Sequence, residues 1–165
     1  MKKILPDVCL FRPEIPQNTG NIGRLVAAVN SRLHLVGPLG FSLENRYLKR
    51  AGLDYWPHLD WSVYEGFEAF VQSRERPPSL AFLSTKGTRS YTDIPVDTDV
   101  IVFGSETKGL SREIMESQKE HLYRIPMYNS NVRSLNLANS VSIVLYDQLA
   151  ARSSRFSQDE PINRQ

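Results

Sequence analysis

The sequence predicts an α/β protein built on a doubly wound, mostly parallel sheet with helices on both faces. Short apolar runs of four to six residues, rich in Val, Ile, Leu or Phe, end at Gly, Pro or Ser, which is typical of strands buried on both faces. Helix-like segments separate these runs, and such alternation favours a parallel sheet. The 165 residues are 41% hydrophobic and 23% charged, a globular composition.

The elements follow one another in a regular order. The predicted strands are 7–11, 33–37, 80–84, 99–104 and 122–126, and the predicted helices between them are 18–31, 42–52 and 111–122. The first helix is expected because Ile22 and Val26, with their apolar neighbours, recur at the spacing of one helical face. The second ends at Gly52, and the third begins at the N-cap residue Ser111.

A fourth helix, over residues 134–152, is the longest and the most apolar. Its hydrophobic residues cover more than one face, so it must be buried in this chain or against another. Because the chain is small, we expect a subunit interface. The polar stretch 153–165 is expected to be a flexible tail. The sequence shows no repeat and no linker, which indicates one domain over residues 1–152.

Composition narrows the possible classes of function. The net charge of +2 gives no independent argument for a nucleic-acid partner. The single cysteine, Cys9, is expected in the core, and the three histidines lack the spacing of metal ligands. A serine nucleophile has no G-x-S-x-G motif to support it. No run approaches the roughly 20 apolar residues of a membrane span, so we expect a cytoplasmic protein.

Polar, glycine-containing loops follow the predicted strands at four places. They are "PEIPQNTGNIGR" (13–24), "FLSTKG" (82–87), "FGSETKGLS" (103–111) and "RIPMYNSNVRSLNLANS" (124–140). Ligands of open α/β sheets bind at the carboxyl ends of strands, so the four loops predict one small-molecule pocket. Within the third loop, Glu106 is a candidate for a general base, a ribose-binding carboxylate or a helix-capping charge.

The first loop allows two interpretations. Gly20 and Gly23 could let a phosphate or ribose approach the start of a helix. Alternatively, Asn18 or Thr19 caps the helix and the glycines only permit close packing. Arg24 lies one turn into the helix, where its forked guanidinium could reach a phosphate, although an arginine on a surface helix often faces solvent.

Three motifs, "NTGNIGR", "FGSETKGL" and "IPM…SLNLANSVSIVLYDQ", occur in this order. Together they resemble the signature motifs of the SPOUT RNA methyltransferases, in the branch that methylates the ribose 2′-hydroxyl. The resemblance covers residues 13–152. The short chain and the stretch "KRAGLDY" (49–55) are most similar to the TrmL-like subfamily, whose members methylate the wobble nucleotide, cytidine or modified uridine 34, of leucine tRNAs.

The resemblance implies a fold, a cofactor and an assembly. The family fold carries a C-terminal trefoil knot, an exception to the rule that chains are unknotted. The methyl donor is S-adenosylmethionine, no metal is used, and a homodimer forms through the C-terminal helix. Carried over onto this sequence, the cofactor contacts fall at Leu83, Gly104, Ile125 and Ser134.

The resemblance also implies catalytic residues. Arg24 is the favoured catalytic residue, and Asn18, Glu106 and Asn136 would orient it or the attacking hydroxyl. A guanidinium stays protonated in proteins, so a general-base role for Arg24 conflicts with its chemistry. Our hypothesis is that Arg24 positions the substrate phosphate and ribose and stabilises the developing negative charge.

Local clusters of basic residues must bind the RNA, because the net charge is low. The candidates are Arg133, Arg46 and Arg50, with a solvated helix face as the alternative for Arg50. A ribosomal-RNA ribose methyltransferase would share every motif and differ only in substrate. A non-catalytic RNA-binding module would be expected to lose Arg24 or the pocket glycines, and all of these are present.

Overall fold

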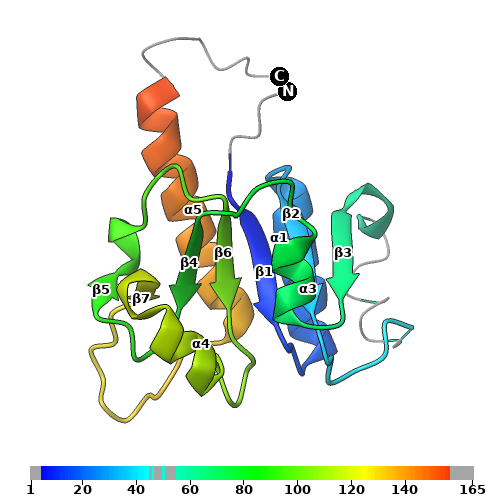
Figure 1. Ribbon diagram of the computed structural model, residues 1–165, viewed down its shortest axis with the longest axis horizontal. Helices are drawn as coiled ribbons and strands as arrows, with labels where there is room; N and C mark the ends of the chain where they lie inside the picture. The colour runs from blue at the N-terminus through cyan, green and yellow to red at the C-terminus, as the bar shows by residue number, and fades with distance from the viewer. Residues whose placement is uncertain (1–4, 45, 47–49, 51–54, 157–165) are drawn as a thin grey trace.

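A computed structural model describes residues 5–44, 46, 50 and 55–156 of the chain. Seven strands form one sheet in the order β3-β2-β1-β6-β4-β7-β5, and every neighbouring pair is parallel (Figure 1). The strands are β1 (Asp7–Phe11), β2 (Arg32–Val36), β3 (Asp60–Tyr64), β4 (Leu80–Leu83), β5 (Arg89–Ser90), β6 (Val100–Phe103) and β7 (Leu122–Arg124). The predicted α/β class with a mostly parallel sheet is confirmed.

Helices cover both faces of the sheet. They are α1 (Pro16–Ala28), α3 (Phe67–Gln72), α4 (Arg112–Ser117) and α5 (Leu137–Phe156), with 3₁₀ turns at Trp56–His58, Tyr91–Asp93 and Lys119–His121. In Figure 1, α1 and α5 lie behind the sheet, and α3 and α4 lie in front of it. Most of the helix expected over 42–52 lies outside the described residues, although Arg46 and Arg50 are helical and exposed.

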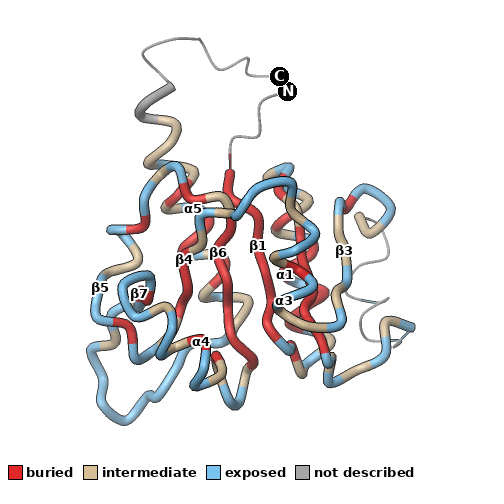
Figure 2. The backbone as a smooth tube through the Cα atoms, in the orientation of Figure 1, coloured by how far each residue is buried: buried red, intermediate tan, exposed pale blue. Residues whose placement is uncertain are grey.

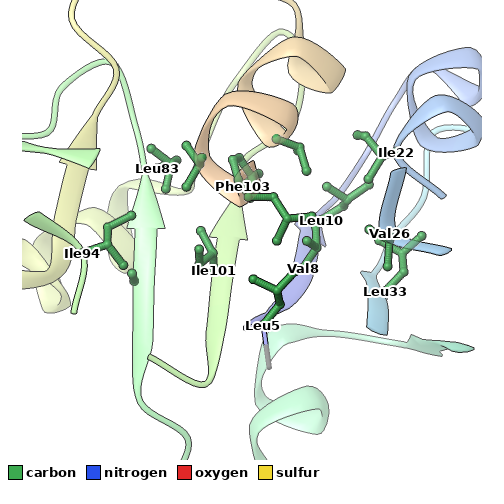
Figure 3. Packing of buried hydrophobic residues seen from close by; sticks show 14 of the residues in the cluster. Leu5, Val8, Leu10, Ile22, Val26, Leu33, Leu83, Ile94, Ile101 and Phe103 are labelled. Carbon is green, nitrogen blue, oxygen red and sulfur yellow. The ribbon is translucent and has the colours of Figure 1, made fainter. Parts of the chain in front are cut away.

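The sheet separates two layers of core, because successive side chains along a strand point to opposite faces. On β1, Val8 and Leu10 face α1 and α5, whereas Cys9 and Phe11 face α3 and α4. Figure 3 shows the first layer, in which Ile22 of α1 packs near Leu10. The central strands are buried along their length (Figure 2). Cys9 is fully buried, as expected, and burial raises the pKa of its thiol.

Two strands and one helix were missed by the sequence pattern. β3 lies at the edge of the sheet, and its residues are half-buried or exposed, so its sequence DWSVY is no continuous apolar run. β5 at the other edge has only two residues. α3 is too short to show helical periodicity, and Phe70 is its one fully buried side chain.

The boundaries of α5 differ from those expected. It begins at Leu137 rather than Ser134, because the side chain of Asn136 accepts a hydrogen bond from the Asn139 N–H (3.2 Å) and so caps the helix. It continues to Phe156, four residues past Arg152, where the sequence pattern placed its end. Residues 157–165 lie outside the described part of the chain.

Only part of α5 packs within this chain. Val141, Val144 and Leu145 are buried against the sheet, but Ile143 is 37% and Tyr146 51% exposed on another face. The hydrophobic residues that cover more than one face of α5 are therefore only partly buried within this chain. Among the described residues, no helix is long and apolar enough to cross a membrane.

A buried polar cluster (Asp7, His34, Tyr64 and Arg74, the His34 cluster) ties β1, β2 and β3 to the segment after α3. Arg74 Nη2 donates to Asp7 Oδ2 (2.9 Å) and contacts His34 Nε2 (2.8 Å). His34 Nδ1 lies 3.2 Å from the Tyr64 hydroxyl. Burial lowers the pKa of His34 below its ordinary value of 6.5, and this outweighs the opposing effect of Asp7. His34 Nε2 also lies 3.1 Å from Asp7 Oδ2, so one ring nitrogen faces the Tyr64 hydroxyl and the other faces the Asp7–Arg74 pair.

The lowered pKa of His34 predicts that stability falls on acidification below pH 6.5. The unfolded chain then binds a proton that the folded chain resists, so the free energy of unfolding drops as the pH falls. Thermal melts between pH 5 and 8 should show a smaller pH dependence in His34→Gln. His121→Gln, which removes an exposed imidazole, is the matched control. Equal pH dependence in His34→Gln and the unchanged protein would contradict the prediction.

Candidate functional site

The four polar loops meet at the carboxyl edge of the sheet, at the bottom of Figure 1. The strand order explains this, because β4 lies between β6 and β7, and β1 lies next to β6. The winding of the chain also reverses between β1 and β6, and ligands of open α/β sheets bind at such a switch point.

The loops enclose a cavity of about 730 Å³, the edge cavity, which falls in the range of roughly 300–1,000 Å³ of small-molecule sites. It is lined by Ile15, Asn18, residues 83–86 and 103–110, Met115, Ile125, Met127, residues 133–137 and Ser140. Leu83, Phe103 and Ile125 give it apolar walls, while Ser84 and Glu106 add polar groups. Such a lining suits a molecule with an apolar body and polar ends.

The structure brings together the four residues expected to contact a cofactor. Leu83 ends β4, Gly104 follows β6, Ile125 follows β7, and Ser134 lies just before α5, and all four line the edge cavity. They are separated by up to 51 positions in the sequence, from Leu83 to Ser134. The shared direction of the strands brings them to one place.

The loop after β6 is held in a tight shape by two glycines. Ser105 and Gly109 exchange backbone hydrogen bonds of 3.1 and 3.0 Å, and Gly109 has a φ of +67°, which L side chains rarely adopt. A Cβ added at Gly104 would lie 2.2 Å from the Gly109 carbonyl carbon and 2.3 Å from the Leu110 nitrogen. The loop can therefore close only when Gly104 has no side chain.

Glu106 projects from this loop to the start of α1. Its carboxylate accepts hydrogen bonds from the backbone N–H groups of Glu14 (2.7 Å) and Ile15 (3.0 Å), and from Asn18 Nδ2 (3.3 Å). The N-cap residue of α1, Ile15, has no side chain that could cap the helix. Of the three roles open to Glu106, the structure shows capping, supplied from a segment about ninety positions away.

A chain of amide hydrogen bonds continues from Glu106 to the start of α5. Asn136 Nδ2 donates to Asn18 Oδ1 (3.0 Å), and Asn18 Nδ2 donates to Glu106. Three of the four expected catalytic residues thus form one connected chain at the wall of the edge cavity. Capping of α1 by Asn18 or Thr19 was wrong, because Asn18 bonds to Glu106 and Asn136, and no side chain of α1 caps its start.

Arg24, the fourth expected catalytic residue, does not line the edge cavity of its own chain. It lies six residues after Asn18 on α1, which turns it about 120° away around the helix. Its side chain is exposed, and its Cζ lies 5.2 Å from the centre of the Tyr55 ring. Burial raises the pKa of Tyr55, and the positive charge of Arg24 opposes this effect.

Of the two glycines of α1, Gly23 serves close packing. A Cβ at Gly23 would lie 3.0 Å from the Trp56 ring, so the absence of a side chain lets α1 pack closely against residues 55–59. The hydroxyl of Tyr55 donates to the carbonyl oxygen of Gly20. Neither glycine lines the edge cavity.

Of the basic residues expected to bind RNA, Arg133 lines the edge cavity and is exposed. Arg46 and Arg50 are exposed but do not line it. Sequence reasoning missed Lys86 and Lys108, although both lie in the polar loops and a search for cations there could have found them. Met115 of α4 also lines the cavity, and no sequence motif marks it.

Comparisons with known proteins agree with this geometry. The model of the SpoU rRNA Methylase family matches residues 7–146. The chain is 49% identical over 143 residues to a tRNA (cytidine(34)-2′-O)-methyltransferase of Methylovorus glucosotrophus, covering 86% of this chain and 92% of that protein. It is 43% identical to the enzyme of the same name from Saccharophagus degradans, covering 86% and 92%.

Solved structures show the same fold. One described as giving structural insights into the 2-OH methylation of C/U34 on tRNA is 39% identical, with a TM-score of 0.84, covering 90% of this chain and 97% of that one. The SpoU methyltransferase AviRb of Streptomyces viridochromogenes, solved with AdoMet, has a TM-score of 0.80 at 23% identity, covering 93% and 63%.

The edge cavity fits S-adenosylmethionine (AdoMet), the donor that the family implies. Its apolar walls suit an adenine ring, and its carboxylate, hydroxyl and backbone groups suit the ribose and the charged methionyl end. Leu83, Gly104, Ile125 and Ser134 are the residues that would hold it. Among the described residues, no group of three or more His, Cys, Asp or Glu side chains could bind a metal ion.

The close packing at Gly104 predicts that Gly104→Ala loses donor affinity. The added methyl overlaps the backbone at Gly109 and forces the loop out of place, at a cost of about 1–3 kcal/mol, so AdoMet binding should weaken about tenfold or more. Isothermal titration calorimetry would measure the affinity. Gly66→Ala is the control, because nothing lies within 4 Å of its added Cβ. Unchanged affinity in Gly104→Ala would refute the role of this glycine.

Proposed function

Because the chain belongs to the SpoU methylase family of AdoMet-dependent enzymes, we propose that it methylates the ribose 2′-hydroxyl of nucleotide 34, cytidine or modified uridine, in leucine tRNAs. The observation that carries the proposal is the chain Glu106–Asn18–Asn136 at the wall of a cavity that suits AdoMet. Relatives that are 43–49% identical and carry the name tRNA (cytidine(34)-2′-O)-methyltransferase support the choice of nucleotide.

The bound donor supplies an electrophilic methyl group, and the protein must hold the hydroxyl in line with it. Much of the rate is then expected from positioning, since correct alignment alone can contribute about 7–11 kcal/mol. Leu83, Gly104, Ile125 and Ser134 would fix the donor from three strand ends and the loop before α5. Asn136, which caps the start of α5 and lines the cavity, would contact the target ribose.

Glu106 is poorly suited to act as the base that takes the hydroxyl proton. Three N–H donors already bond to its two oxygens, so the carboxylate is occupied in holding the start of α1 and the amide of Asn18. We assign it instead to positioning: it fixes the amide of Asn18, and Asn18 fixes the amide of Asn136. The orientation of both amides is then determined, because each oxygen and nitrogen has its own partner.

Arg24 would act on the substrate from a second copy of the chain. Its guanidinium is exposed and stacked near Tyr55, away from the edge cavity of its own chain. A homodimer would allow Arg24 of one subunit to approach the cavity of the other. The uncovered face of α5, with Ile143 and Tyr146, supports the helix as the dimer interface. Acting on tRNA, the protein would work in the cytoplasm.

The C-terminal trefoil knot also belongs to the proposal. Strand β4 lies between β6 and β7, so the loops after β4, β6 and β7 crowd at one edge, and the segment before α5 lines the same cavity. A knotted chain would require these loops to lie against one another in this way.

Methyl transfer from labelled AdoMet to bulk tRNA that lacks this modification tests the function. We expect label on the ribose of nucleotide 34 of leucine tRNAs, located by nuclease mapping. Label on ribosomal RNA alone would support ribose methylation as the reaction but refute tRNA as the substrate. AdoMet binding with no transfer to any RNA would refute the proposed activity and favour a binding module.

Replacement of Arg24 tests its role. Arg24→Ala should lower kcat by about 10²–10³-fold, the loss typical of removing one preorganised donor to a developing negative charge. Arg24→Lys should recover only part, because an ammonium lacks the planar fork of a guanidinium. Single-turnover methylation measures the step, with Arg76→Lys at the opposite sheet edge as control. Near-normal turnover in Arg24→Lys would sink a specific guanidinium role.

Replacement of Ile143 tests the dimer. Ile143→Asp places a charge on the uncovered face of α5, where burial without a partner is unfavourable, so the protein should become monomeric. Light scattering after gel filtration measures the mass. Val63→Asp is the matched control, since Val63 is 43% and Ile143 37% exposed. A dimeric Ile143→Asp protein would show that another surface mediates association.

A further inference from the structure

A second hollow of about 410 Å³ adjoins the edge cavity, between α4 and the segment after β4. We call it the α4 hollow. Its wall includes Lys86, Thr88, Arg112, Glu116 and Lys119. Lys86 and Met115 line both spaces, so the α4 hollow is next to the cavity proposed to hold the donor.

The α4 hollow has an excess of positive charge. Its one carboxylate, Glu116, is neutralised by Arg112, whose Nε lies 2.7 Å from Glu116 Oε1. Lys86 and Lys119 are both exposed, and neither has a carboxylate partner among the described residues. Arg89 lies close by, since its guanidinium donates to the carbonyl oxygen of Glu120 (3.2 Å).

Two ammonium groups without a carboxylate partner, one from each side of the hollow, are suited to an anion. Lysine is a point charge with three donors and binds phosphate without the geometric demands of arginine. The hydroxyl of Thr88 adds a further donor. The protein as a whole carries only +2, so an RNA chain must be attracted by such local groups rather than by the overall field.

We propose that the α4 hollow binds a backbone phosphate of the RNA substrate, beside the nucleotide that is methylated. This inference rests on the proposed function. The position of the hollow supports the proposal, because a phosphate bound next to the edge cavity would be near the target ribose. The role differs from that of Arg133, Arg46 and Arg50, which lie outside this hollow.

Lys119→Ala tests the site through salt dependence, because Lys119 lines the α4 hollow but not the edge cavity. The affinity for an anticodon stem-loop RNA is measured by fluorescence anisotropy from 50 to 300 mM salt. Loss of one phosphate contact should reduce the slope of log affinity against log salt by about 0.7–0.9. KM for the RNA should rise while kcat is retained, and Lys119→Arg should restore the slope.

Arg76→Ala is the matched control, because it removes an equal charge near the amino end of β4, at the opposite edge of the sheet. If the wild-type protein binds and methylates the RNA but Lys119→Ala leaves the salt slope unchanged, the phosphate site is refuted and the proposed function is kept. Weaker AdoMet binding in Lys119→Ala also refutes the phosphate site, since the hollow would then hold the donor's carboxylate. A wild-type protein that neither binds nor methylates any RNA refutes the proposed function and this site with it.

Discussion

The carboxylate of Glu106 joins the loop after β6 to the start of α1, and the edge cavity depends on this contact. Glu106 satisfies two backbone N–H groups that the sequence of α1 leaves without a cap, and it carries a negative charge to the positive end of the helix. Through Asn18 and Asn136 the same carboxylate fixes the first turn of α5. Three segments that are distant in sequence are thus held by one side chain.

This arrangement shows why polar residues in the site act as a unit. Asn18 and Asn136 each use the amide both to bond a neighbour and to face the cavity, so a change at Glu106 alters the direction in which Asn136 presents its amide. The cations are organised differently. Those near the cavity come from separate loops, and further cations, Arg112 and Lys119, line the neighbouring hollow rather than the cavity itself.

The sequence predicted secondary structure well where burial determines the pattern of hydrophobic residues. The central strands are continuous apolar runs because both of their faces are covered, so β1, β2, β4 and β6 were predicted at nearly their observed positions. The edge strand β3 is half-exposed and gives no such signal. Convergence of the four loops followed from the shared direction of parallel strands. The residues expected to contact the cofactor were named from the family resemblance.

Other features depended on contacts that no local pattern contains. The role of Glu106 could not be chosen from three alternatives, since its partners lie about ninety positions away. The hydrogen bond between Asn18 and Asn136 spans 118 positions. The location of Arg24 beside Tyr55, off the cavity of its own chain, depends on how α1 rotates against residues 55–59, which periodicity alone does not determine.

The tight loop at Gly104 also has a meaning for evolution. Because any side chain at this position overlaps the backbone of Gly109 and Leu110, the position can drift only after the loop has lost its shape. Arg24, in contrast, is exposed, so we expect its replacement to disturb the fold of its own chain less than a change at Gly104. In duplicated copies that no longer transfer methyl groups, Arg24 should therefore be replaced before Gly104. A copy without Arg24 that keeps Gly104 would be at an early stage of losing the activity.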